Sequence, residues 1–141
     1  MKDIMLKIIG KQFFGDNPED KMEFITEGKL YKKNGATYLV YDESEVSGQP
    51  GCKTTLKMSG DVIKMRRLGD SVGYGSEIVF EEGKRFTGEY ETPYGLMKME
   101  VLTNSIRNNL TEDGLGDIDI DYQVSLKGMA EGRNILNIHI M

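Results

Sequence analysis

The sequence contains no tryptophan, one cysteine, one histidine and three prolines in 141 residues. Because Cys52 has no second cysteine to pair with, no internal disulfide can form, as is typical of proteins in a reducing compartment. The N-terminal residues lack the long apolar core of a signal peptide. No uninterrupted apolar run approaches the roughly 20 residues that cross a bilayer as a helix. We therefore expect a cytoplasmic protein with no membrane partner.

Basic residues are also in the minority. The 18 lysines and arginines stand against 23 aspartates and glutamates, which gives a formal net charge of −5. The basic residues are dispersed along the chain, and Arg66-Arg67 is the only adjacent arginine pair. Nucleic-acid binding usually depends on a basic domain or stripe, because phosphate neutralisation dominates the affinity. The composition therefore predicts no nucleic-acid partner.

Signatures of catalysis and of cofactor binding are missing as well. A nucleophilic triad needs a histidine or equivalent base beside an activated serine or cysteine. The one histidine, His139, falls on the polar parity of the last apolar segment and is expected to face solvent. A zinc site would need more cysteine and histidine ligands than the chain has, and no glycine-rich phosphate loop occurs. The sequence thus predicts no catalytic residue, no metal and no cofactor.

The carboxylates Asp117, Asp119 and Asp121 are spaced like the start of a calcium-binding loop. Such a loop requires glycine at its sixth position and glutamate at its twelfth, where this sequence has Tyr122 and Gly128. We therefore expect the three carboxylates to lie on a solvated outer face rather than around an ion.

The clearest pattern in the chain is the strict alternation of apolar and polar residues from Asp117 to Lys127. Successive side chains of a strand point to opposite faces, so the pattern predicts a half-buried strand. Similar patterns predict strands over 3–13, 22–33, 36–43, 52–59, 61–68, 76–82, 84–91, 95–107, 117–127 and 133–140. Residues 104–113 are expected to form either a bent strand end or one short helical turn.

Turn signals separate these segments. Asn34-Gly35 predicts a tight hairpin, since both residue types tolerate positive φ. Further turns are expected at 59–61, 82–84, 92–95 and 131–133. We predict one all-β domain over residues 1–141, and we favour an antiparallel up-and-down meander barrel of about eight to ten strands, because closure removes exposed sheet edges. The pattern leaves a two-sheet sandwich as the alternative.

A group of aromatic and basic residues in the middle of the chain is the candidate ligand site. In the functional interpretation these side chains line the mouth of a cavity, and in the structural one they fill the core and turn corners. The candidates are Tyr41, Arg66, Arg85, Phe86, Tyr90, Tyr94 and Tyr122, and Arg67 is an alternative to Arg66 and Arg85.

Four segments resemble, in the same order and spacing, the YwiB-like family, a bacterial group of unknown function found mainly among Firmicutes. They are residues 34–43 (NGATYLVYDE), 80–83 (FEEG), 90–95 (YETPYG) and 118–122 (IDIDY). The resemblance implies a calycin-like, lipocalin-like β-barrel and carries over no catalytic residue.

Two functions are favoured at this stage, and an enzyme, which would need a carboxylate of strongly perturbed pKa inside a pocket, comes third. In the first, the barrel binds a small, partly apolar molecule in its lumen, an inference from architecture alone. In the second, the chain is a protein–protein interaction module without ligand or catalysis, in which the carboxylate row at 117–121 meets a basic surface. The sequence leaves the oligomeric state undetermined.

Overall fold

The computed structural model describes residues 2–13, 20–42, 52–69, 75–92, 95–126 and 130–141. Within them every regular element is a β-strand, and no helix is long and apolar enough to cross a membrane. The strands are β1 (Lys2–Phe13), β2 (Asp20–Lys33), β3 (Ala36–Asp42), β4 (Cys52–Ser59), β5 (Val62–Gly69), β6 (Gly75–Glu81), β7 (Arg85–Thr92), β8 (Gly95–Leu110), β9 (Gly116–Leu126) and β10 (Ala130–Ile140).

All ten strands expected from the alternation are present. At the predicted hairpin, Asn34 and Gly35 have φ angles of 54° and 79°, the conformation of a tight two-residue turn. Residues 104–113 contain a bent strand, because β8 continues to Leu110 past a bulge between Thr103 and Ser105. The prediction of a turn at 131–133 was wrong, since these residues already pair with β9 inside β10. The turn expected at 92–95 lies mostly outside the described residues.

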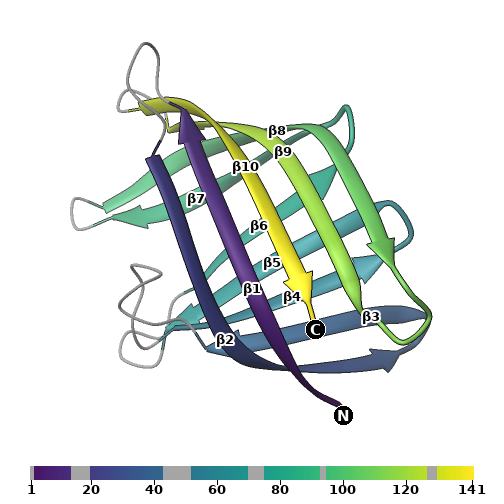
Figure 1. Cartoon of the computed structure of the whole chain (residues 1–141). Helices are drawn as coiled ribbons and strands as arrows, with labels where there is room; N and C mark the ends of the chain where they lie inside the picture. Colours follow the sequence, from purple (N-terminus) through teal and green to yellow (C-terminus); the bar gives the residue numbers. More distant parts are fainter. Residues whose placement is uncertain (1, 14–19, 43–51, 70–74, 93–94, 127–129) are drawn as a thin grey trace.

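The ten strands form one antiparallel sheet in the order β6-β5-β4-β3-β2-β1-β10-β9-β8-β7. Every neighbouring pair except β1–β10 is consecutive in the chain. The β1–β10 ladder runs from Leu6 opposite Ile140 to Phe13 opposite Arg133, so the first and last strands lie side by side (Figure 1). The sheet curls until β6 and β7 come into contact, which confirms the predicted meander barrel.

The seam of the barrel lies between β6 and β7. Although these strands are consecutive, no ladder joins them in the described residues. The ring of Phe86 lies over Gly88 instead, and a Cβ added at Gly88 would stand 2.8 Å from the Phe86 Cε1 atom. Glycine at this position therefore makes room for the ring on β7, and the same added Cβ would stand 3.8 Å from the Glu77 carbonyl oxygen of β6.

The core fills the interior of the barrel. On β9 the predicted alternation is confirmed, because Ile118 and Ile120 are buried while Asp117, Asp119 and Asp121 stay on the outer face. Other strands contribute inward residues in the same way. The largest fully buried apolar side chains are Leu6, Ile8, Leu39, Leu56, Ile63, Phe80, Val101, Ile118, Ile120, Ile138 and Ile140.

The turn between β8 and β9 packs against one end of this core. Thr111 and Leu115 are joined by a backbone hydrogen bond of 2.8 Å, and the Lys32 ammonium donates to the Glu112 carbonyl oxygen at 2.8 Å. Gly114, with φ +80°, lies so close to Leu30 that an added Cβ would overlap the leucine Cδ2 atom. The turn thus covers the end of the barrel that also holds the chain termini (Figure 1).

Two glycines with the same backbone conformation allow this packing to be tested. Gly35 has φ +79° with nothing within 4 Å of an added Cβ, whereas at Gly114 the Cβ would meet Leu30, which is only 4% exposed. We expect Gly35→Ala to cost about 1–2 kcal/mol, the penalty of the left-handed conformation. Gly114→Ala should cost about 1–3 kcal/mol more, through overpacking. Urea unfolding measures both, and equal costs would contradict the tight contact with Leu30.

Candidate functional site

Three polar side chains from adjacent strands point into the barrel near one of its ends. Tyr41 lies opposite Thr54, and Thr54 lies opposite Arg67. Tyr41 is 5% exposed and Thr54 is fully buried, while Arg67 shares the inward parity of Ile63 and Met65. Each of the three lies within two residues of the end of its strand, at the barrel end opposite the β8–β9 turn.

The facing wall supplies two further polar groups. Thr103 lies opposite Tyr122, and the Tyr122 ring packs against Phe80 with centroids 4.8 Å apart. Burial raises the pKa of Tyr122, and the positive charge of Arg67 acts in the opposite direction. Arg67 is thus the cation whose charge acts on the Tyr122 hydroxyl.

We call these inward groups, Tyr41, Thr54, Arg67, Thr103 and Tyr122, the polar belt. The hydroxyl of Thr103 is buried and has no hydrogen-bond partner among the described residues. Buried polar groups normally find a partner, in protein, water or ligand. The belt is thus the part of the interior best equipped to hold a molecule that is not wholly apolar.

The structure divides the residues predicted for the ligand site. Tyr41, Phe86 and Tyr122 face the interior. Arg66 and Arg85 lie on the outer face, with side chains 62% and 61% exposed, beside Glu77 at 3.4 Å and Glu100 at 3.8 Å respectively. The side chain of Tyr90 and the whole of Tyr94 lie outside the described part of the chain.

Arg67, the alternative to Arg66 and Arg85, is the arginine of the three that shares the inward parity of a strand. Its position could have been found from the sequence, because Ile63, Met65 and Arg67 share one parity of a predicted strand while Lys64 and Arg66 share the other. A strand that buries its two apolar residues therefore carries Arg67 inside as well. The neighbouring arginines point to opposite sides of the sheet.

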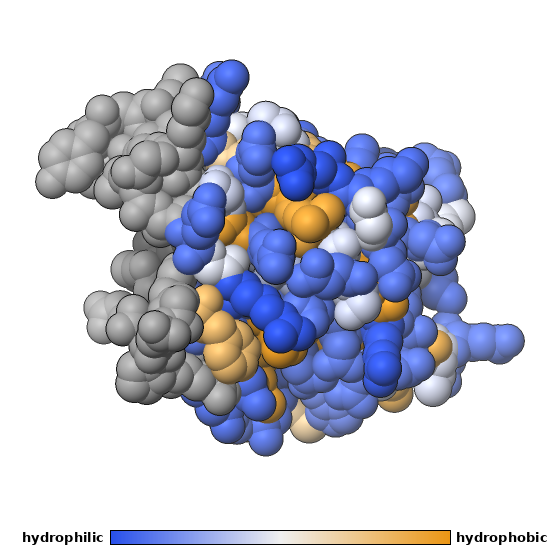
Figure 2. All heavy atoms as spheres, turned by 90° about the horizontal axis from the view of Figure 1, so that it is seen from above, coloured by the Kyte–Doolittle hydropathy of each residue, from blue (hydrophilic) through white to orange (hydrophobic). Residues whose placement is uncertain are grey.

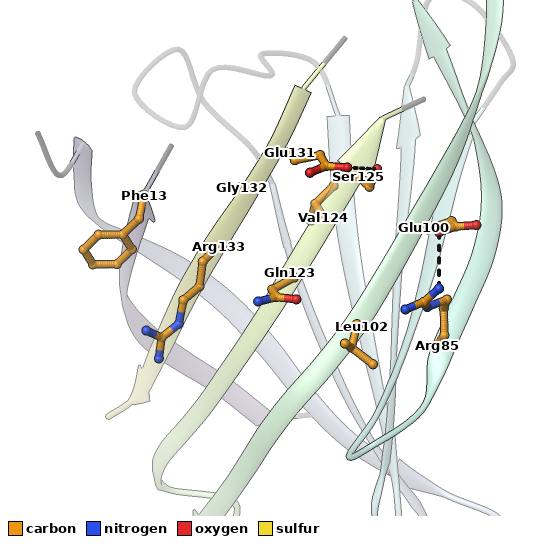
Figure 3. A pocket seen from close by; sticks show the side chains of 10 residues that line it. All are labelled: Phe13, Arg85, Glu100, Leu102, Gln123, Val124, Ser125, Glu131, Gly132 and Arg133. Atoms are coloured by element: carbon orange, nitrogen blue, oxygen red, sulfur yellow. Dashed lines mark hydrogen bonds and ion pairs between the residues drawn. The ribbon is translucent and has the colours of Figure 1, made fainter. Parts of the chain in front are cut away.

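A groove of about 460 Å³ crosses the outer face of β10, β9, β8 and β7. A single cross-strand row runs along it, from Phe13 through Arg133, Gln123 and Leu102 to Arg85 (Figure 3). Both arginines are close to carboxylates: Arg133 binds Asp121 and Arg85 approaches Glu100. The face seen in Figure 2 is largely hydrophilic, with apolar residues in separate spots. The groove therefore offers balanced charge rather than an unmatched cation.

The carboxylate row on β9 is engaged by the neighbouring strand. The Asp117 carboxylate lies 2.9 Å from Nδ1 of His139. The Asp119 carboxylate accepts a hydrogen bond of 2.7 Å from Asn137. These two contacts tie the row to β10, and in the described residues no group of three or more histidine, cysteine or carboxylate side chains could hold a metal ion.

Asp121, the third carboxylate, has the most partners of the row. It accepts two hydrogen bonds from the Arg133 guanidinium, the one from Nε being 2.9 Å long, and a third of 3.3 Å from the Asn104 amide. Hydrogen bonding to Arg133 is the main reason why the pKa of Asp121 lies below its ordinary value of 3.8, and burial only partly opposes it. The pair thus fixes the β9–β10 side of the groove.

Replacing Arg133 tests this assignment. In Arg133→Met, the pKa of Asp121 should rise toward the ordinary value, because the ionised carboxylate loses its main hydrogen-bond donor. The depressed pKa stabilises the fold above the unfolded-state value near 3.8, and this contribution disappears as the pH falls through the folded-state value. The stability difference between wild type and variant should therefore shrink below about pH 4. A carbon-detected NMR titration reports the pKa directly.

Arg107→Met is the matched control, because Arg107 lies on the outer face opposite Asp119 and has no ion pair in the described residues. It should leave the pKa of Asp121 unchanged. An equal rise in both variants would mean that general charge, rather than the Arg133 hydrogen bonds, governs Asp121.

Comparison with known proteins agrees with the fold. The model of a domain of unknown function, DUF1934, matches residues 6–138. The chain is 31% identical over 110 residues to the uncharacterized beta-barrel protein YwiB of Bacillus subtilis (strain 168), covering 77% of this chain and 72% of that protein. The crystal structure of ywiB protein from Bacillus subtilis superposes with a TM-score of 0.68 at 21% identity, over 97% of this chain and 90% of that one. The chain therefore belongs to the YwiB-like DUF1934 family, β-barrel proteins of unknown function.

Proposed function

We propose that the chain binds a small, partly apolar molecule inside the barrel, at the polar belt. The observation that carries the proposal is the inward row Tyr41–Thr54–Arg67, which places two hydroxyls and a guanidinium within an interior otherwise built from aliphatic and aromatic side chains. Binding sites for small molecules combine an apolar lining with a few convergent polar groups that fix orientation. The belt and the surrounding core supply both.

The chemistry of the belt defines the ligand class. Arg67 is a fixed cation with several N–H donors, and the hydroxyls of Tyr41, Tyr122 and Thr103 can each donate or accept. A ligand with a carboxylate or another acceptor group would meet Arg67, while its apolar part would lie against rings such as Phe80.

The position of the belt supports entry from one end. The opposite end is covered by the β8–β9 turn, where Gly114 and Leu30 are in close contact. The belt residues Tyr41, Thr54 and Arg67 lie near the other end, close to the termini of β3, β4 and β5. A molecule that enters from that side reaches polar groups before it reaches the aliphatic core.

The interaction-module alternative has less support, because its key surface is already occupied. Asp117, Asp119 and Asp121 already contact His139, Asn137 and Arg133 on β10, so their oxygens are partly satisfied within the sheet, and Asp121 is also matched by the Arg133 cation. As part of the proposal we place the chain in the cytoplasm, in keeping with its single cysteine.

Paired variants of the neighbouring arginines test the proposal. A thermal-shift screen with a fatty acid, a flavin, haem and a set of metabolite carboxylates should find a compound that stabilises the wild type. A ligand at 100 times its Kd adds about 2.7 kcal/mol of stability. Arg67→Met should lose most of the shift, because it removes the interior cation, whereas Arg66→Met changes only the outer face and should keep it.

Native mass spectrometry of the purified protein adds an independent measurement, because a bound molecule raises the mass of the intact species. Tyr122→Phe keeps the ring against Phe80 and removes only the hydroxyl, so this variant can test the proposal if Arg67→Met does not fold. The proposal is wrong if no class of compound stabilises the wild type and no added mass is found. It is equally wrong if Arg67→Met and Tyr122→Phe both retain the full wild-type shift.

A further inference from the structure

The outer face of β2–β5 gathers cations that are far apart in the sequence. The ladders align two cross-strand rows here, each with one residue from each strand, and two pairs beside them. The rows are Lys29–Val40–Thr55–Arg66 and Tyr31–Tyr38–Lys57–Lys64, and the pairs are Lys33–Ala36 and Ser59–Val62. These twelve positions hold five cations and no carboxylate, in a chain whose formal net charge is −5. We call them the basic face.

The central row of the basic face is a stack. The rings of Tyr31 and Tyr38 are parallel, with 2° between their planes and 4.9 Å between their centroids. The Lys57 ammonium stands 5.8 Å from the centroid of Tyr38. Because Tyr38 lies between a ring and a cation, its position is fixed from both sides. The stack holds Lys57 in place at the middle of the face.

Neighbouring carboxylates leave most of this charge unneutralised. Among the described residues, carboxylates pair only with the two cations in the outermost positions of one row, Lys29 with Asp3 at 3.5 Å and Arg66 with Glu77 at 3.4 Å. Lys33, Lys57 and Lys64 form no ion pair with any described residue. Charges are screened over about 8 Å at physiological salt, so a binding partner senses this local surplus rather than the net charge of the chain.

We infer that the basic face binds the sugar–phosphate backbone of single-stranded nucleic acid. Its polar groups are ammonium and guanidinium donors together with the hydroxyls of Tyr31, Tyr38, Thr55 and Ser59, which suits a partner that offers repeated anionic acceptors. Phosphodiesters carry one such charge per nucleotide, and lysine binds them as a point charge. The cations are dispersed along the chain, which is why composition predicted no such partner.

The same geometry narrows the mode of binding. Tyr31 and Tyr38 stack on each other and Lys57 lies over Tyr38, so these rings offer little free surface on which bases could stack. Recognition through phosphates alone would not depend on the nucleotide sequence of the bound strand. The outer side of a barrel is convex across its strands (Figure 1), which a flexible single strand can follow more easily than a stiff duplex.

Fluorescence anisotropy with a labelled 20-nucleotide oligo(dT) and an oligo(U) of the same length tests the inference. We expect wild-type binding that weakens with salt, with a slope of log K against log salt of about −0.7 per phosphate contact. Lys33→Glu/Lys64→Glu should lose about tenfold or more in affinity and show a shallower slope, because two phosphate contacts are removed. Both residues are exposed, so the fold should be retained.

Lys98→Glu/Arg107→Glu is the matched control. It changes the net charge equally, and these residues lie on β8, away from the basic face. The control should bind within about twofold of wild type, because general charge acts weakly beyond the Debye length. Equal loss in both double variants would overturn the inference, as would an absence of binding at 50 mM salt. Full displacement of the oligonucleotide by an equimolar poly-glutamate peptide would point instead to an acidic protein partner.

Discussion

The pairing of β1 with β10 is the contact on which the rest of the barrel depends. It joins the two ends of the chain in one ladder, extended by the hydrogen bonds that Met5 and Met141 exchange. Without it, β1-to-β6 and β7-to-β10 would be two separate meanders, each with exposed edges and half an inner face. With it, the inward residues of both halves meet, and Arg67 on β5 comes within electrostatic reach of Tyr122 on β9.

The curled sheet has two faces of different chemistry, because strand parity separates their side chains. Lys64 and Arg66 point outward while Met65 and Arg67 point inward, so one strand contributes both to the basic face and to the polar belt. The two proposed sites therefore share a backbone but no side chain. Substitutions in one leave the chemistry of the other unchanged, and the two proposals stand or fall independently.

Local patterns predicted the strands, while the sites depended on register. Asn34-Gly35 and the alternation of β9 contain their own structural signal within a few residues, so the hairpin and the inward Ile118 and Ile120 could be recognised. The alternation within β5 also predicts that Arg67 points inward, because Ile63 and Met65 have the same parity and are buried. The turn at Asn34-Gly35 places Tyr31 opposite Tyr38, and the turn at 60–61 places Lys57 opposite Lys64. No local pattern aligns Tyr38 with Lys57, because that pairing depends on the offset of the β3–β4 ladder. Nor does any local pattern predict the curvature that brings β6 into contact with β7.

The seam between β6 and β7 has a consequence for the order of folding. Read from β7 through β10 and on from β1 to β6, the sheet is a succession of neighbouring hairpins, and only the β1–β10 ladder spans nearly the whole chain. Folding rates fall as contacts become more distant in sequence, so this one ladder dominates the loop entropy of the topology. A circular permutant with the original termini linked and new ends at Glu82-Gly83 would have only local pairings. Its new ends would lie between β6 and β7, the consecutive strands that no ladder joins in the described residues.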